Sequence, residues 1–149
     1  SQFAIDGIAG EVLLSGTERW VFERKQAMEQ IQWDDFMKVE LRVGTIVAAE
    51  EFPEARRPAY KLQVDFGEEI GMKKSSAQIT DLYTIEELVG KRVMAVVNFP
   101  AKQIGPIMSE CLVTGFTNKE GAVVLAVPDP SVASSGSATA DVANGERLI

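Results

Sequence analysis

The stretch from Phe36 to Val127 is built of short apolar segments separated by loops that carry glycine and proline. Within most of these segments apolar and polar residues alternate, and a period of two is typical of strands that bury one face. A helical period of 3.6 residues fits only one short segment in the middle of this stretch. The pattern therefore restricts the central part of the chain to a mostly β architecture.

Gly44 lies inside the first of these segments, where a glycine predicts a bulge or a sharp bend of the strand. The loop from Phe52 to Pro58 contains two prolines and is not expected to join a strand ladder. Asn118 to Gly121 has the composition of a hairpin turn. The strands that we expect are Val39–Ala49, Tyr60–Phe66, a weaker one at Ile70–Gln78, Val93–Asn98, Cys111–Phe116 and an extension at Ala122–Val127.

A short helix is expected from Ile79 to Val89. Thr84 and Glu87 have the spacing of a capping box, and Gly90 follows where a helix commonly ends. Strands with one helix between the third and the fourth follow the order of a five-stranded Greek-key barrel, the OB fold. We therefore predict an all-β protein, a β-barrel with short helices, that carries an N-terminal helical extension.

The flanks of the barrel segment differ from it in composition. Residues 1–33 are predicted to be an extension, with a helix over Thr17–Gln30 whose apolar face covers the main domain or a partner. Residues 34–129 form the predicted OB domain, and residues 130–149 a Ser/Ala-rich C-terminal segment. Within that segment we expect a flexible excursion over Val132–Ala143 and a return of Gly145–Ile149 to the barrel surface.

The chain has no histidine and one cysteine, Cys111. These counts exclude histidine-based catalysis, histidine metal sites and thiolate zinc sites, so we expect a binding protein with no catalytic residues, no metal and no cofactor. No apolar run reaches the length of a membrane span, and the start lacks the pattern of a signal peptide, which predicts a cytoplasmic protein that does not enter membranes.

The net charge of −7 disfavours nonspecific binding to nucleic acid. The charge is uneven, however, because residues 36–110 hold 10 basic and 11 acidic side chains. The central segment is therefore nearly neutral and can still present a basic face. The alternative is a solvated surface of mixed charge, which is the more common outcome.

Several short segments carry a family resemblance. Asp35-Phe36, Leu41-Arg42-Val43-Gly44-Thr45-Ile46 and Lys61 to Gly67 resemble the tRNA-binding-domain OB family, as do Val96-Val97-Asn98-Phe99 and Ser109-Glu110. Phe52 to Arg56, Ile70 to Lys73 with Ser75 to Thr80, and Val96 to Pro100 are closest to its CsaA branch of secretion chaperones. The resemblance implies a non-enzymatic homodimer that binds unfolded or preprotein segments and engages the protein-export machinery.

One departure concerns RNA contact. The tRNA-binding branch typically reads Ser-x-Gly-Met after the fourth strand, and its Gly and Met are associated with RNA. Here the register gives Ser109-Glu110-Cys111-Leu112, which weakens the expectation of tRNA contact at these positions. Cys111 itself is expected to face the barrel core as a small apolar side chain.

The segment Phe99 to Met108 is the main candidate for ligand contact. Two prolines and a glycine predict an irregular loop, yet Phe99, Ile104 and Met108 are apolar. These side chains either form an exposed binding patch or fold back into the barrel end or a dimer contact. The candidate binding residues are Arg42, Lys61, Lys73, Lys74, Ser75, Ser76, Gln78, Asn98, Phe99, Lys102, Ile104, Met108, Ser109 and Glu110.

Two groups among these candidates have structural alternatives. The donors from Lys73 to Gln78 suit a polar rim for a peptide or phosphate backbone, or else turn chemistry before the helix. The Glu110 carboxylate either fixes an amide of an extended peptide or pairs with Arg42 or Lys102 to hold the loop, and we expect the second. The resulting hypothesis is an export-related chaperone that binds peptide segments, and the alternative is tRNA binding by the same barrel face.

Overall fold

A computed structural model describes residues 28–133 and 141–149 of the 149-residue chain. The chain divides into two compact units, Ser1–Lys38 and Val39–Ile149. In the first unit the described part contains one short helix, α3 (Trp33–Met37), in which the rings of Trp33 and Phe36 lie 5.2 Å apart. The helix predicted over Thr17–Gln30 falls almost wholly outside the described residues.

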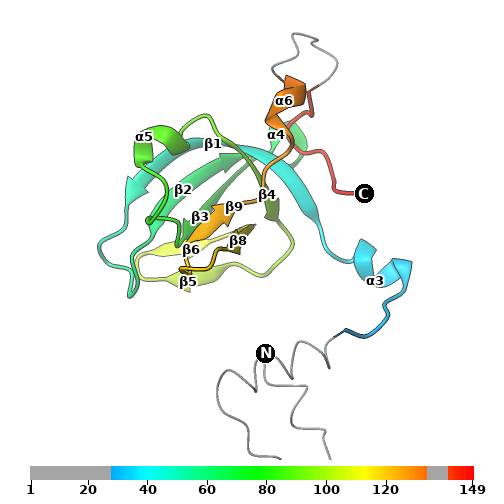
Figure 1. The fold of residues 1–149 in the computed structure, drawn as a ribbon, viewed down its shortest axis with the longest axis horizontal. Coiled ribbons are helices and arrows are strands. Elements are labelled where there is room, and N and C mark those ends of the chain that lie inside the picture. The colour runs from blue at the N-terminus through cyan, green and yellow to red at the C-terminus, as the bar shows by residue number, and fades with distance from the viewer. Residues whose placement is uncertain (1–27, 134–140) are drawn as a thin grey trace, which may run out of the picture. The chain divides into compact units, whose positions relative to one another are not determined.

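The second unit is a nearly closed antiparallel barrel with few short helices, which confirms the predicted OB-type all-β fold (Figure 1). Five strands follow the order β3-β2-β1-β4-β7, and two hairpins, β5–β6 and β8–β9, complete the sheet structure. No helix among the described residues is long and apolar enough to cross a membrane. The strands are β1 (Leu41–Glu51), β2 (Tyr60–Asp65), β3 (Met72–Ala77), β4 (Arg92–Val96), β5 (Lys102–Ile104), β6 (Ile107–Ser109), β7 (Leu112–Val113), β8 (Gly115–Thr117) and β9 (Val123–Leu125).

Strand β1 is long enough to pair with two partners. Its first half pairs with β4 and its second half with β2, and the register shifts between Ile46 and Ala48. We had predicted the irregularity at Gly44, but it lies further along the strand. Gly44 has another role: a Cβ placed on it would meet Val64 Cγ1 at 2.6 Å and Phe66 Cε1 at 2.8 Å. Because Gly44 has no side chain, Val64 of β2 and Phe66 just after β2 can pack against the β1 backbone.

The core follows from the period of two. Alternate side chains of β2 and β4 point inward and are almost completely buried, while their neighbours face outward. Ser75, on β3, is a buried polar residue of this core, and its hydroxyl donates to the Cys111 carbonyl at 2.9 Å. The largest fully buried side chains are Phe66, Ile46, Leu62, Leu88, Val64 and Val93.

The predicted central helix is shorter than expected. Only α5 (Ile85–Leu88) is helical, because the capping box of Thr84 and Glu87 starts the helix at residue 85, and Gly90 follows with φ +92°. Leu88 inserts into the core from this helix. A one-turn helix, α4 (Gly67–Ile70), connects β2 to β3.

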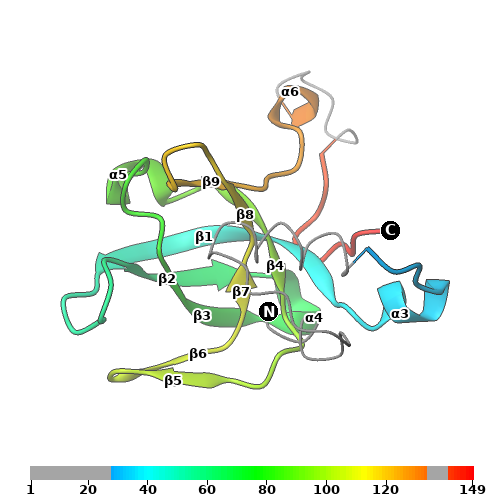
Figure 2. The same ribbon diagram turned by 60° about the horizontal axis from the view of Figure 1, so that its bottom comes forward.

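The segment predicted to be an irregular loop forms the β5–β6 hairpin instead, as Figures 1 and 2 show. Its three cross-strand pairs run from Lys102↔Ser109 to Ile104↔Ile107. The prolines do not prevent it, because Pro100 precedes β5 and Pro106 lies in the turn beside Gly105, whose φ is +53°. The prediction treated these residues as interruptions of a strand, whereas they mark its ends.

The predicted fifth strand and the predicted hairpin turn at Asn118 to Gly121 are confirmed in outline. The predicted fifth strand is divided into β7 and β8 around Thr114, whose N–H donates to the Met94 carbonyl at 2.9 Å. Asn118 organises the turn before β9, because its side-chain oxygen accepts from the N–H groups of Glu120 and Ala122.

Helix α6 (Pro130–Ala133) follows β9, and most of the excursion predicted over Val132–Ala143 lies outside the described residues.

The predicted return of Gly145–Ile149 to the barrel is confirmed. Gly145 N–H donates to the Val43 carbonyl at 2.7 Å, and Val43 N–H donates to the Glu146 carbonyl at 3.0 Å. Leu148 N–H adds a bond of 2.8 Å to the Leu41 carbonyl. The C-terminal residues thus lie against the first half of β1, on the side that β2 leaves open.

Candidate binding surface

The outer face of β1, β2 and β3 presents a ladder of polar side chains. Gln63 stands between Ala48 and Lys74 in the register, and Lys61 stands between Glu50 and Ser76. These positions alternate with the buried residues of the core, so their side chains point away from the barrel. In OB folds ligands bind on this face and at two connections beside it. Here these connections are the loop between β1 and β2 and the segment between β4 and β7, which contains the β5–β6 hairpin.

The barrel closes along a seam between β3 and the segment after β6. Glu110 N–H donates to the Lys74 carbonyl at 2.7 Å, and the Lys74 N–H donates to the Glu110 carboxylate at 2.9 Å. Cys111 lies at the seam and faces the core, as predicted, and burial raises the pKa of its thiol to about 11. The seam fixes the base of the β5–β6 hairpin beside the outer face.

The tip of the hairpin contacts the loop between β1 and β2. A Cβ on Gly105 would lie 3.6 Å from Cζ of Phe52 and 3.8 Å from Cβ of Glu54. Phe52 is buried, and the Lys61 ammonium lies 5.7 Å from the centre of its ring. Because the two loops meet at Phe52, the rim of the outer face has a defined shape.

A groove of about 170 Å³ lies between the outer face and the hairpin. We call it the hairpin groove. Ile107 supplies its hairpin wall, and side chains of the polar ladder supply its floor and opposite wall. The groove is lined by Ala48, Glu50, Lys61, Leu62, Gln63, Lys74 and Ile107.

Apolar side chains are exposed around the hairpin. Phe99 is 57% exposed and Met108 is 39% exposed, whereas Ile104 is half-buried. Of the two outcomes considered for the apolar segment, the exposed one therefore holds for Phe99 and Met108. Exposed apolar groups of this kind can contact a ligand without rearrangement of the barrel.

Cationic side chains lie in the groove, at Lys61 and Lys74, and on the hairpin, at Lys102. Lys61 forms an ion pair with Glu50, with Nζ and a carboxylate oxygen 3.4 Å apart. Lys74 and Lys102 are exposed, and within the described part of the chain neither forms an ion pair. Two positive charges are therefore available to an incoming ligand.

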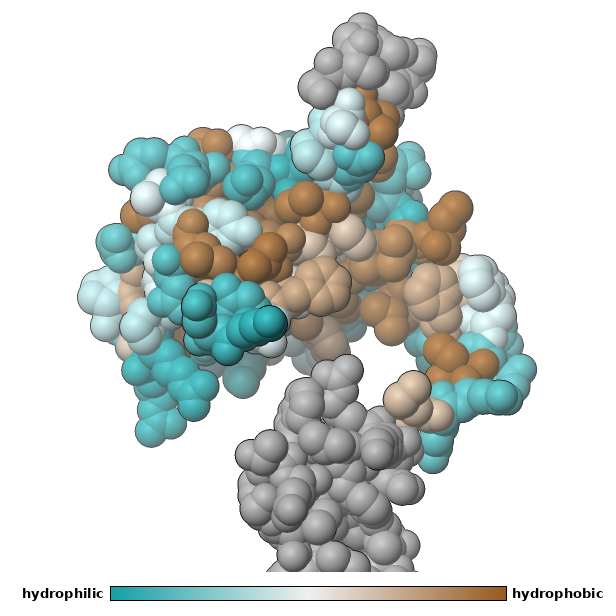
Figure 3. All heavy atoms as spheres, viewed as in Figure 1, coloured by the Kyte–Doolittle hydropathy of each residue, from teal (hydrophilic) through white to brown (hydrophobic). Residues whose placement is uncertain are grey.

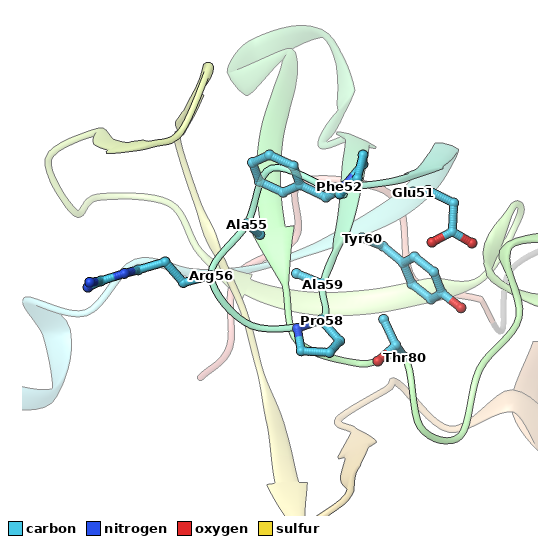
Figure 4. Close-up of a pocket in the computed structure, with 9 residues that line it drawn as sticks. Glu51, Phe52, Ala55, Arg56, Pro58, Ala59, Tyr60 and Thr80 are labelled. Carbon is cyan, nitrogen blue, oxygen red and sulfur yellow. The ribbon is translucent and has the colours of Figure 1, made fainter.

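A second hollow, of about 430 Å³, lies beside the loop between β1 and β2 (Figure 4). We call it the loop pocket. Phe52 lies between this pocket and the hairpin groove. It lines the pocket, and its ring contacts the ammonium of Lys61, which lines the groove. The loop pocket is lined by Glu51, Phe52, Pro53, Ala55, Arg56, Pro58, Ala59, Tyr60 and Thr80.

An apolar surface covers the outer side of the last strands. Phe116 on β8 is 71% exposed, and its cross-strand partner Val124 on β9 is also exposed. Leu112 on β7 adds a further exposed side chain. Figure 3 shows hydrophobic residues gathered over β8, β9 and the neighbouring β4. We call Leu112, Phe116 and Val124 the apolar face.

The comparisons with known proteins agree with this geometry. A family model described as "Putative tRNA binding domain" matches residues 41–137. The chain belongs to this tRNA-binding-domain family. The family resemblance expected from the sequence is thereby confirmed.

This tRNA-binding domain is similar to two solved CsaA chaperones. The chaperone from Picrophilus torridus is 42% identical, with a TM-score of 0.69, over 80% of this chain and 100% of the other. The chaperone from Bacillus anthracis is 43% identical, with a TM-score of 0.68, over 81% of this chain and 100% of the other.

The tRNA-binding domain is also similar to methionine–tRNA ligases. The ligase of Flavobacterium johnsoniae is 34% identical over 99 residues, which are 66% of this chain and 14% of the ligase. The domain therefore spans about a seventh of the ligase it matches, and this similarity concerns one part of that enzyme.

Some predicted residues of the tRNA-binding domain lie away from the hairpin groove. Arg42 bonds Glu40, with Nη2 and the carboxylate 2.8 Å apart, and donates to the Gly145 carbonyl. The predicted pairing of Glu110 with Arg42 or Lys102 is wrong, because Glu110 accepts from the Lys74 backbone across the seam. Asn98 accepts from the Glu40 N–H at 3.1 Å. Arg42, Asn98 and the buried Ser75 are therefore held by internal contacts.

Of the other predicted residues, some line the hairpin groove or lie at the seam beside it, and others do not. Lys61 and Lys74 line the groove. Ser76 N–H donates to the Ser109 hydroxyl at 3.3 Å, which places both beside the seam. Lys73 is half-buried on the inner side of β3, and Gln78 is exposed just past the end of that strand.

Sequence reasoning missed the loop pocket and the apolar face. No residue pattern marks the pocket, because Thr80 joins it from a distant part of the chain. The apolar face did leave a signal. Cys111 and Val113 face the core, while Leu112 and Phe116 are apolar as well, so this segment is apolar on both sides.

Proposed function

We propose that this domain is a non-enzymatic binder of extended apolar polypeptide segments at the hairpin groove. The observation that carries the proposal is the exposure of Met108, next to the groove residue Ile107 in β6, and of Phe99 in the segment that leads into β5. Flexible thioether and aromatic side chains bury varied apolar partners without requiring one sequence. Such a surface suits a chaperone that holds many different clients weakly.

Polar groups of the groove support the same reading. The side chains of Lys74 and Gln63 are cross-strand neighbours on the outer face, and both line the groove. An extended peptide has free carbonyl groups, which these two side chains can meet as hydrogen-bond donors. A groove of about 170 Å³ accommodates one or two apolar side chains of such a segment.

Similarity to proteins described as CsaA chaperones supports a chaperone role. We extend the proposal to unfolded or preprotein segments as clients and to the protein-export machinery as a partner, which the family resemblance implies. Binding would leave the client chemically unchanged.

A Phe99→Ala variant should bind a fluorescent apolar peptide roughly tenfold more weakly than the wild type, because it loses most of the apolar area that the peptide covers there. Fluorescence anisotropy measures the affinity. Leu82→Ala is the matched control, since Leu82 is an exposed apolar residue in the segment between β3 and α5 rather than at the hairpin. Equal affinities for Phe99→Ala and Leu82→Ala would contradict this placement of the site.

Binding of tRNA by the same face is the second candidate. It is favoured by the family model and by the similarity to methionine–tRNA ligases. Lys74 and Lys102 offer charges to phosphates, and Phe99 offers a ring on which a base can stack. This candidate differs from the first in its dependence on salt, because counterion release drives association with nucleic acid.

We also propose that two copies pair through the apolar face. Phe116 and Val124 form an exposed cross-strand pair, and a sheet that is apolar on its outer side gains stability when another surface covers it. A second copy presents the same three side chains and matches them by two-fold symmetry.

A Phe116→Glu variant should sediment as a monomer at concentrations where the wild type is a dimer. The new carboxylate would be buried without a partner, which we expect to weaken pairing by roughly a hundredfold or more. Analytical ultracentrifugation reads the change. Val89→Glu places the same charge on another exposed apolar position and should remain dimeric. A dimeric Phe116→Glu protein would place the interface elsewhere.

A further inference from the structure

The loop pocket has one acidic wall. Its floor contains Phe52, Tyr60 and Pro58, and Glu51 stands at the edge. Figure 4 shows the Glu51 carboxylate and the Tyr60 hydroxyl on one side of the pocket, while the Arg56 guanidinium points away from them. Glu51 forms no ion pair within the described residues. The pocket therefore combines apolar surface with an available negative charge.

Several acidic side chains act on this wall of the pocket. The pKa of Tyr60 is raised from its usual value first by burial and then by the charges of Glu51, Glu86 and Glu87. A phosphate would be repelled by the Glu51 wall, whereas a cation would be attracted.

We propose that the loop pocket receives a lysine or arginine side chain of a bound polypeptide. The aliphatic part of such a side chain packs on the apolar floor, and its charged end meets the Glu51 carboxylate. The Thr80 hydroxyl lines the same pocket and can accept a further hydrogen bond. A volume of about 430 Å³ exceeds what one such side chain needs, so water accompanies it.

This inference rests on the proposed polypeptide function and makes it more specific. Tyr60 and Lys61 are neighbours on β2 and line the pocket and the groove, respectively. A single extended chain that passes over Phe52 and Lys61 can place an apolar residue in the groove and a basic residue in the pocket. The preferred client is therefore an apolar segment with a basic residue next to it.

The test compares two labelled peptides of one apolar sequence. One is flanked on both sides by lysines and the other by glutamines, so that the direction of binding does not matter. The affinities of the full chain and of Glu51→Gln are measured by fluorescence anisotropy. Glu54→Gln is the matched control, because Glu54 is a carboxylate three residues further along, in the β1–β2 loop, that does not line the pocket.

The wild type should prefer the lysine peptide roughly fivefold, the typical upper range for one partly exposed ion pair. Glu51→Gln should abolish this preference without weakening the glutamine peptide, and Glu54→Gln should retain it. Equal binding of the two peptides to the wild type, or equal effects of the two substitutions, would overturn the pocket while leaving peptide binding intact. Failure of both peptides to bind would overturn the polypeptide function and the pocket together.

Discussion

A Gly44→Val variant should lose about 3 kcal/mol of unfolding free energy, because the added side chain overpacks the core. Its Cβ would lie 2.6 Å from Cγ1 of Val64 and 2.8 Å from Cε1 of Phe66. Both neighbours are fully buried and have no room to move aside. Urea denaturation followed by circular dichroism measures the change.

The control for this substitution is Val47→Ala in the same strand. Val47 is exposed, so shortening it should cost less than about 1 kcal/mol. If Gly44→Val unfolded at the wild-type urea concentration, the close approach of β1 to the end of β2 would be wrong.

A Gly145→Ala variant should lose about 3 kcal/mol and release the C-terminal residues from β1. Gly145 has φ +94°, a left-handed conformation that alanine adopts at a cost, and its Cβ would lie 2.6 Å from the Phe66 carbonyl oxygen. Hydrogen exchange at the Leu148 and Val43 amides should accelerate with the loss of stability. Both amides donate hydrogen bonds that join the C-terminal residues to β1.

Gly121→Ala separates the two causes of that loss. Gly121 has φ +83°, yet no atom lies within 4 Å of where its Cβ would be placed. This control should cost only about 1 kcal/mol from backbone strain. Equal losses for Gly121→Ala and Gly145→Ala would show that the C-terminal residues are not packed against Phe66.

The strand order and the core could be predicted because both depend on local patterns. Alternation of apolar and polar residues identifies β2, and a continuous apolar run from Val93 to Val97 identifies β4. The capping box of Thr84 and Glu87 identifies the start of α5. The C-terminal return was also predicted, and the backbone bonds of Gly145 and Leu148 confirm it. Each of these features is expressed in a few consecutive residues.

Features that depend on distant contacts were not predicted correctly. Glu110 was assigned to a charged side chain, but closure of the barrel brings it to the Lys74 backbone. Gly44 was assigned to a bulge, but the approach of Phe66 requires it. The loop pocket likewise combines Thr80 with the β1–β2 loop, which the sequence cannot bring together without the fold.

The central claim is that the hairpin groove binds polypeptide by apolar burial. The most direct measurement titrates the protein against a labelled apolar peptide and a labelled tRNA, each at low and at physiological salt. Our account predicts peptide binding whose affinity changes little with salt, and tRNA binding that is weak or absent at physiological salt. Tight tRNA binding that falls steeply as salt rises, with no binding of the peptide, would contradict it.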